Sequence, residues 1–179
     1  MSEDRVRWSG PLRLLHWLMA ALIVALIGVG WTMTHIRSDL GTTFTLYQWH
    51  KSYGCLVAVL LVLRVAARLV APAPPPIEHS RLERQAARAA HLAFYALMLA
   101  VPASGWLMAA ASPLALPTRP FELFTLPAPV APDEALFGWL QPLHEVAAYG
   151  LLALLALHVL ATLKHQFVDR DHILRRITF

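Results

Sequence analysis

Long apolar stretches separated by short polar segments dominate the pattern of this chain. Residues 14–34, 89–116 and 146–163 contain no Asp, Glu, Lys or Arg. A helix needs about 20 apolar residues to cross a hydrocarbon layer of about 30 Å, so each of these stretches predicts a membrane span. A fourth stretch, residues 47–69, is apolar apart from three basic residues. We assign it as a span as well, because three spans would leave the charge distribution described below unexplained.

The predicted fold is therefore an all-α integral membrane protein, formed by residues 1–179 as one domain. The four spans are expected at about residues 14–35, 47–70, 89–111 and 142–165. Short connections between most of them favour an up-and-down bundle of four helices. The exception is the long, proline-rich connection 112–140, which is either a cap over one surface of the bundle or a solvated link.

The charged residues fit a membrane protein better than a nucleic-acid-binding one. The chain is 58% hydrophobic and only 15% charged, whereas soluble domains are about 25% charged. With four spans, three basic residues lie on one side, namely Arg37, Lys51 and Arg119. The other twelve lie on the opposite side: Arg5, Arg7, Arg13, Arg64, Arg68, Arg81, Arg84, Arg88, Lys164, Arg170, Arg175 and Arg176. The positive-inside rule then places both termini in the cytoplasm, with lipid rather than nucleic acid as the partner of the basic surface.

Two histidines in the last apolar stretch are the first candidate functional residues. His144 and His158 are fourteen positions apart, which corresponds to ~21 Å along a helix. At ~100° per residue they also lie within ~40° of each other around the helix axis. Ionisable residues inside a membrane usually face the bundle interior and serve a function.

Each of these histidines has a possible partner at its own depth. His50 starts the second span at the outer side and matches His144, whereas His16 starts the first span at the inner side and matches His158. Paired imidazoles in an apolar bundle are typical of axial ligands to haem iron, so we expect two haem b groups. A lone membrane histidine is more often a hydrogen-bonding residue, but four that pair by depth favour ligation. A zinc site would need converging ligands, and a proton relay would favour buried carboxylates, which the spans almost lack.

Three further residues belong to this hypothesis. Arg64 lies fourteen positions after His50, so it is expected near the inner haem, either as a partner of the anionic propionates or as an anchor in the head groups. Gly54 lies one turn after His50, where a missing side chain would let a macrocycle approach. His91 starts the third span at the inner side and could hold a propionate or a quinone, or replace one of the inner ligands.

Five segments carry a resemblance to a known family. "GPLRLLHW", "YQWHKSYG", "RVAARLVAPAPPP", "HLAFYALMLAVPASGWLM" and "PLHEVAAYGLLALLALHVLATLKH" together resemble the bacterial cytochrome b561 family. The spacing of fourteen is also similar to that in the cytochrome b subunits of membrane formate dehydrogenases and hydrogenases. The family pattern implies the same pairs, His16 with His158 and His50 with His144.

The resemblance also implies a function. Free-standing members are di-haem cytochromes of the bacterial inner membrane that oxidise superoxide at the outer side and reduce ubiquinone, which favours an oxidoreductase. Lys51, beside His50, could steer superoxide electrostatically, or it could be an interfacial anchor. For the quinone head group the candidates are His91, Arg13 and Trp17 on the inner side, or Glu145 and Trp49 on the outer side.

Two alternative functions remain open. In the first, the chain is a non-catalytic electron-transfer subunit that links a periplasmic redox partner or a dehydrogenase to quinone. In the second, it is a structural or transport protein without haem. The single cysteine, Cys55, gives no disulfide framework and no thiolate metal cluster for any of these functions.

Overall fold

The computed structural model describes residues 7–75 and 80–179, and within these ranges it is helical and contains no strand. Its four long helices are α1 (Gly10–His35), α2 (Leu40–Val70), α3 (Arg81–Ala111) and α4 (Glu134–Lys164). All four are long and apolar enough to cross a membrane. The predicted all-α membrane fold with four spans is thereby confirmed.

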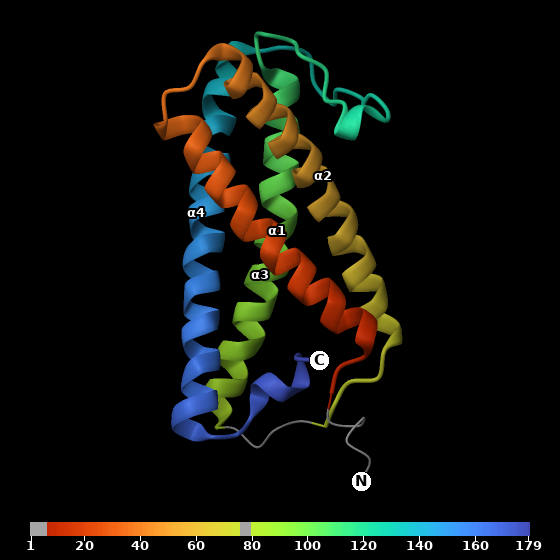
Figure 1. The fold of residues 1–179 in the computed structure, drawn as a ribbon, viewed down its shortest axis with the longest axis vertical. Coiled ribbons are helices and arrows are strands. Elements are labelled where there is room, and N and C mark those ends of the chain that lie inside the picture. The colour runs from red at the N-terminus through yellow and green to blue at the C-terminus, as the bar shows by residue number, and fades with distance from the viewer. Residues whose placement is uncertain (1–6, 76–79) are drawn as a thin grey trace.

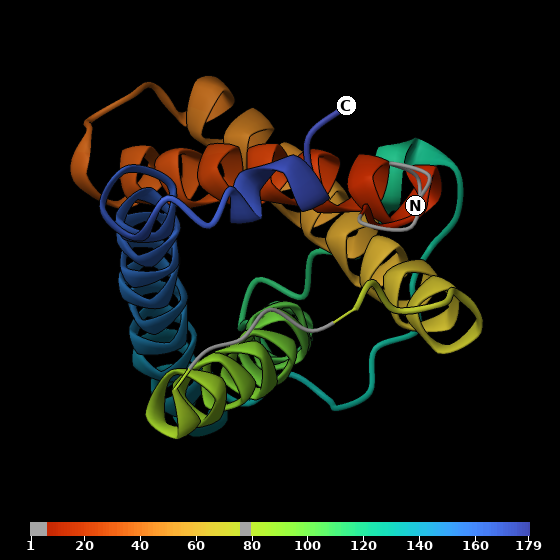
Figure 2. The same cartoon turned by 90° about the horizontal axis from the view of Figure 1, so that it is seen from below.

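Consecutive helices run in opposite directions, as in an up-and-down bundle. In Figure 1 the described residues nearest the two termini lie at the lower end, together with the last residues of α2 and the first residues of α3. The connections from α1 to α2 and from α3 to α4 lie at the upper end. We call the lower end the inner end and the upper end the outer end, after the predicted membrane orientation. Seen from below, α1 pairs with α2, and α3 pairs with α4 (Figure 2).

Polar side chains fix where the helices begin. Asp39 caps α2 by accepting a hydrogen bond from Thr42 N–H at 2.9 Å, and Asp133 caps α4 in the same way. The bonds from Thr42 also hold the pKa of Asp39 below its usual value. Ser80 and Glu83 form a capping box at the start of α3, which satisfies two backbone donors that have no partner inside the helix. Because these caps precede the apolar stretches, α2 and α4 begin several residues before the predicted spans.

The outer surfaces of the helices are apolar and face away from the protein. Only 6–17% of the most apolar window in each helix is buried inside the protein. Large side chains such as Val62, Leu99 and Leu157 are more than half exposed. A lipid bilayer covers such surfaces without the free-energy cost they would have in water.

The core of the bundle lies at mid-depth. It is formed by six buried residues contributed by all four helices: Met19, Val57, Leu60, Leu61, Met98 and Leu151. On each helix, these residues lie between the polar residues near the inner end and those near the outer end. The core therefore separates the two ends of the bundle.

The connection between α3 and α4, residues 112–133, is folded over the outer end of α2. Its short 3-10 helix η2 (Pro120–Glu122) packs on α2. Phe121 N–H donates to the buried Ser52 Oγ at 3.1 Å, and the Phe121 ring meets Tyr53 edge-on at 5.2 Å between centroids. We call this connection the cap; its η2 helix is packed on α2, whereas most of its other residues are exposed.

The inner end is closed by the residues that follow α4. These form a short π-helix, η3 (His165–Asp169), and a 3-10 helix, η4 (Ile173–Arg176). Backbone carbonyls at the end of the chain accept hydrogen bonds from Arg13 at 2.8 Å and from Trp17 at 3.0 Å.

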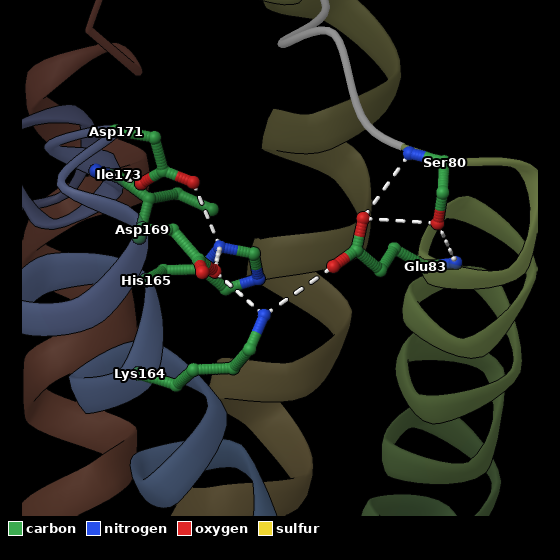
Figure 3. Close-up of polar contacts among 7 residues, drawn as sticks. All are labelled: Ser80, Glu83, Lys164, His165, Asp169, Asp171 and Ile173. Atoms are coloured by element: carbon green, nitrogen blue, oxygen red, sulfur yellow. Dashed lines mark hydrogen bonds and ion pairs between the residues drawn. The ribbon is translucent and has the colours of Figure 1, made fainter.

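A polar cluster joins α3 to the end of α4. Lys164 Nζ lies 2.7 Å from Asp169 and 3.4 Å from Glu83, and His165 Nδ1 lies 2.7 Å from Asp171 (Figure 3). The carboxylates of this cluster therefore have partners within the protein, and the cluster ties the inner ends of two helices together.

Candidate functional site

The structure brings the four predicted histidines together as two pairs. At the inner end, the rings of His16 on α1 and His158 on α4 have centroids 6.3 Å apart, at an angle of 62° between planes. At the outer end, the rings of His50 on α2 and His144 on α4 have centroids 6.2 Å apart, at an angle of 80°. Both pairs join helices that are distant in the sequence, and they do so at different depths of the bundle.

Spacing along α2 and α4 explains why these side chains point inward. Val57 lies midway between His50 and Arg64, and Leu151 lies midway between His144 and His158. Steps of seven residues return to nearly the same side of a helix. Because Val57 is 5% exposed and Leu151 is 4% exposed, the polar residues one step away from them also face the bundle interior.

Aromatic and basic side chains surround the inner pair. Arg64 Nη2 lies 3.3 Å from His16 Nδ1. The Trp17 ring contacts His16 edge-on at 5.3 Å between centroids, and Phe94 contacts His158 in the same manner at 5.4 Å. His91 is close enough to act electrostatically on both histidines of the pair. The three inner histidines singled out in the sequence, His16, His91 and His158, thus lie in one cluster with Arg64.

The outer pair has neighbours of a different kind. His144 Nδ1 lies 3.0 Å from the Val101 carbonyl oxygen and 3.1 Å from Ser104 Oγ. A Cβ atom added to Gly105 would lie only 3.0 Å from His144 Cε1, and one added to Gly30 would lie 3.4 Å from His50 Cε1. Gly30 on α1 therefore lies against the His50 ring, and Gly105 on α3 lies against the His144 ring.

Sequence reasoning missed these α1 and α3 residues. The segment "VPASG" places a small polar residue and a glycine three and four positions after Val101. This is a recognisable signal for close helix packing in a membrane, but it does not identify the facing residue as His144.

The geometry of both pairs fits a haem iron held between two imidazoles. With metal–nitrogen bonds of about 2.0 Å, two rings on opposite sides of one metal ion have centroids roughly 6 Å apart. Both observed separations agree with this value.

The remaining candidates are placed as follows. Lys51 is partly buried beside His50, and Glu122 of η2 is near enough to interact with its charge. At Gly54 an added Cβ would meet no atom within 4 Å, so open space lies next to this glycine. Arg13 and Trp17, two of the quinone candidates, each donate a hydrogen bond to backbone carbonyls at the end of the chain.

Comparisons with known proteins show which family this chain resembles. A family model described as prokaryotic cytochrome b561 matches residues 7–179. Cytochrome b561 homolog 2 from Escherichia coli strain K12 is 34% identical over 163 residues, which cover 90% of this chain and 86% of that relative.

Proposed function

The chain belongs to the prokaryotic cytochrome b561 family, and from that premise we propose that it transfers single electrons between a donor at the outer side of the bacterial inner membrane and the quinone pool. Membership makes it a multi-pass membrane cytochrome of a haem b-binding family. The observation that carries the proposal is the pair of facing histidines at each end of the bundle.

We assign one haem b to each histidine pair. His16 and His158 would hold the inner haem, and His50 and His144 the outer one. Bound haem supplies one-electron chemistry at its iron, with a reduction potential set by the axial ligands and their surroundings. The apolar core between the pairs excludes water, and its residues hold the three ligand-bearing helices and α3 at fixed depths.

The distribution of basic residues supports an orientation with both termini in the cytoplasm. Of the twelve basic residues predicted on the inner side, Arg5 lies outside the described residues. The other eleven lie at the inner end of a helix or in the segments beyond it. Cytoplasmic enrichment in Lys and Arg is the strongest single determinant of membrane orientation.

Superoxide is the donor we propose, and ubiquinone the acceptor. Two superoxide ions give up one electron each and become O2, and one ubiquinone takes up both electrons and two protons to become ubiquinol. The reaction therefore balances without another oxidant or reductant. Lys51 supports the assignment, because a cation beside the outer pair attracts an anionic donor. Glu122 partly offsets that charge.

Arg64, His91 and Gly54 would complete the haem sites. Arg64 lies in the inner cluster, where a guanidinium can neutralise the anionic propionates of a haem in a place with little water. His91 lies in the same cluster and is suited to bind a propionate or a quinone oxygen. Gly54 leaves space one turn from His50 for the edge of the outer haem.

A second candidate function follows from the outer surface. Leu123 and Phe124 of the cap are 77% and 56% exposed, and a partner protein docked on the outer end would cover them. In this function the chain is an electron-transfer subunit that connects a periplasmic redox protein or dehydrogenase to quinone, and superoxide is not its substrate.

Stopped-flow spectroscopy of the purified single chain distinguishes the two. If superoxide is the donor, the haem absorption bands change within the mixing experiment, ubiquinone then reoxidises the protein, and superoxide dismutase abolishes the reduction. If the protein remains oxidised with superoxide but is reduced by a co-purifying periplasmic protein, the subunit function is correct and the superoxide proposal is wrong.

A further inference from the structure

The two histidine pairs differ in the charge of the groups that touch them. The inner pair has a guanidinium beside it, since Arg64 lies 3.3 Å from His16 Nδ1. The outer pair has a carbonyl and a hydroxyl beside it, both bonded to His144 Nδ1. Such neighbours affect the electron density of an imidazole in opposite directions, because a cation withdraws it and a hydrogen-bond acceptor increases it.

The bond to Val101 determines which nitrogen of His144 can bind a metal. A carbonyl oxygen only accepts hydrogen bonds, so the proton of a neutral His144 ring must be on Nδ1. The Nε2 atom then carries the free lone pair. The contact with α3 therefore selects the tautomer of His144.

Ser104 and Gly105 hold the ring in this position. Ser104 is 7% exposed, and its hydroxyl donates to the same Val101 carbonyl at 2.9 Å, which leaves its oxygen as a second acceptor for His144 Nδ1–H. Gly105 allows the close approach, since any side chain there would begin 3.3 Å from His144 Nδ1 and 3.0 Å from Cε1. We call Val101, Ser104 and Gly105 the α3 cradle.

We propose that the α3 cradle positions His144 and lowers the reduction potential of the outer haem below that of the inner haem. The proposal rests on the two-haem function above. A ligand that donates its second N–H to an acceptor is more basic, and a more basic ligand stabilises the oxidised, more positive iron. Arg64 acts in the opposite sense at the inner pair, because its positive charge offsets the negative charge of a propionate that would otherwise stabilise the oxidised iron. Lys51, next to His50, acts in the same sense as Arg64 but does not touch either ring of the outer pair, and Glu122, which also lies 3.2 Å from Arg119, offsets its charge in part.

This order of potentials assigns a direction to the protein. Electrons that enter at the outer end move to the site of higher potential at the inner end, and quinone reduction on the inner side would follow. Val101, Ser104 and Gly105 touch His144 and not the reacting atoms, so they are positioning residues.

Potentiometric titration of the haem absorption bands in the purified full chain tests the proposal. The wild-type protein should titrate in two steps, and the step that disappears in His50→Ala identifies the outer haem. We expect this step to be the lower one. Ser104→Ala should shift it to higher potential and leave the inner step in place, whereas Ser104→Thr, which keeps the hydroxyl, should restore the wild-type value.

Gly105→Ala provides a second, independent variant, with Gly30→Ala as its matched control. The added methyl at Gly105 requires His144 to shift by a few tenths of an ångström, which weakens its hydrogen bond to the Val101 carbonyl, so the outer step should again rise. At Gly30 the added methyl makes only ordinary contact with His50, and the outer step should stay near its wild-type position.

An outer step above the inner one would overturn the proposal. So would an outer step that stays at its wild-type potential in both Ser104→Ala and Gly105→Ala. A single haem in the wild-type chain, or two haems in His50→Ala, would refute the ligand assignment of the proposed function itself, and the α3 cradle with it.

Discussion

The paired histidines differ from the other histidines in the residues that contact them. His35, at the outer end of α1, stacks on Trp31 at 5.1 Å between centroids and contacts its carbonyl oxygen. His165, at the inner end of α4, is paired with Asp169 and Asp171. These two rings have ordinary partners from nearby in the sequence. His50 and His144, in contrast, face each other across the bundle, which is the arrangement a shared ligand requires.

Gly54 provides a sharp test of where the outer haem lies. An added Cβ meets no atom within 4 Å here, and the same holds at Gly138 near the start of α4. Because the protein itself leaves room, Gly54→Leu should fold normally but bind one haem fewer, since the new side chain would occupy the space we assign to the macrocycle. The measurement is haem content per purified chain, with circular dichroism as the check of folding.

Gly138→Leu is the control for this variant and should keep both haems. Full haem content in Gly54→Leu would show that no macrocycle lies against this glycine, and would remove Gly54 from the site.

Lys51 carries the prediction about superoxide. Electrostatic attraction as a whole raises association rates by about tenfold or more. Because Lys51 supplies part of that attraction, Lys51→Ala should slow haem reduction by superoxide by up to about tenfold at low ionic strength. The dependence of the rate on salt should weaken as well. Arg175→Ala, which removes an exposed cation at the inner end, should react as the wild type does. Equal rates and equal salt dependence for Lys51→Ala would assign Lys51 to membrane anchoring alone.

The connection between α3 and α4 depends on one buried hydrogen bond to α2. Ser52 is 6% exposed and accepts the Phe121 N–H, and an average hydrogen bond of this kind contributes about 1 kcal/mol. Ser52→Ala should therefore loosen residues 119–123 and leave the four long helices intact. Hydrogen exchange at the Phe121 amide measures this directly.

Ser112→Ala is a suitable comparison, because Ser112 lies in the same connection but bonds only to nearby backbone. Exchange at Phe121 should be unchanged there. Equal protection of Phe121 in Ser52→Ala and the wild type would mean that packing against Tyr53 holds the cap without the hydrogen bond.

The number and order of the helices could be predicted from the sequence, but not where they begin or how the outer connection folds. Hydropathy detects the segment of α2 that crosses lipid, whereas the helix itself begins at Leu40, capped by Asp39. The fold of the cap depends on Phe121, which adopts a positive φ of 51°. An ordinary side chain rarely does so, and no sequence pattern reveals it.

The pairing of the histidines could be predicted because it depends only on depth. Position along a membrane helix converts directly into depth at ~1.5 Å per residue, so residues from distant helices can be matched without knowing which helices touch. The α3 cradle could not be predicted in this way. It requires α3 to lie beside α4 at the level of His144, and that is a property of helix packing.

The bundle core keeps the two candidate haem sites apart. Leu151 is 4% exposed and lies midway between the two histidines of α4. Leu151→Ala should cost roughly 2–5 kcal/mol of stability through lost packing and the cavity left behind, and thermal unfolding in detergent measures it. Leu160→Ala, the same change at a side chain that is 61% exposed, should cost far less. Equal losses would mean that the helices pack differently around the core.

The most direct test of the two-haem assignment is a count of haems by the pyridine haemochromogen assay, on the wild-type chain and on alanine variants of His16, His50, His91, His144 and His158. The wild-type chain should contain about two haems b. His16→Ala, His50→Ala, His144→Ala and His158→Ala should each lose one of them, and His91→Ala should keep both. One haem or none in the wild type, or a loss confined to His91→Ala, would contradict the assignment of the two pairs.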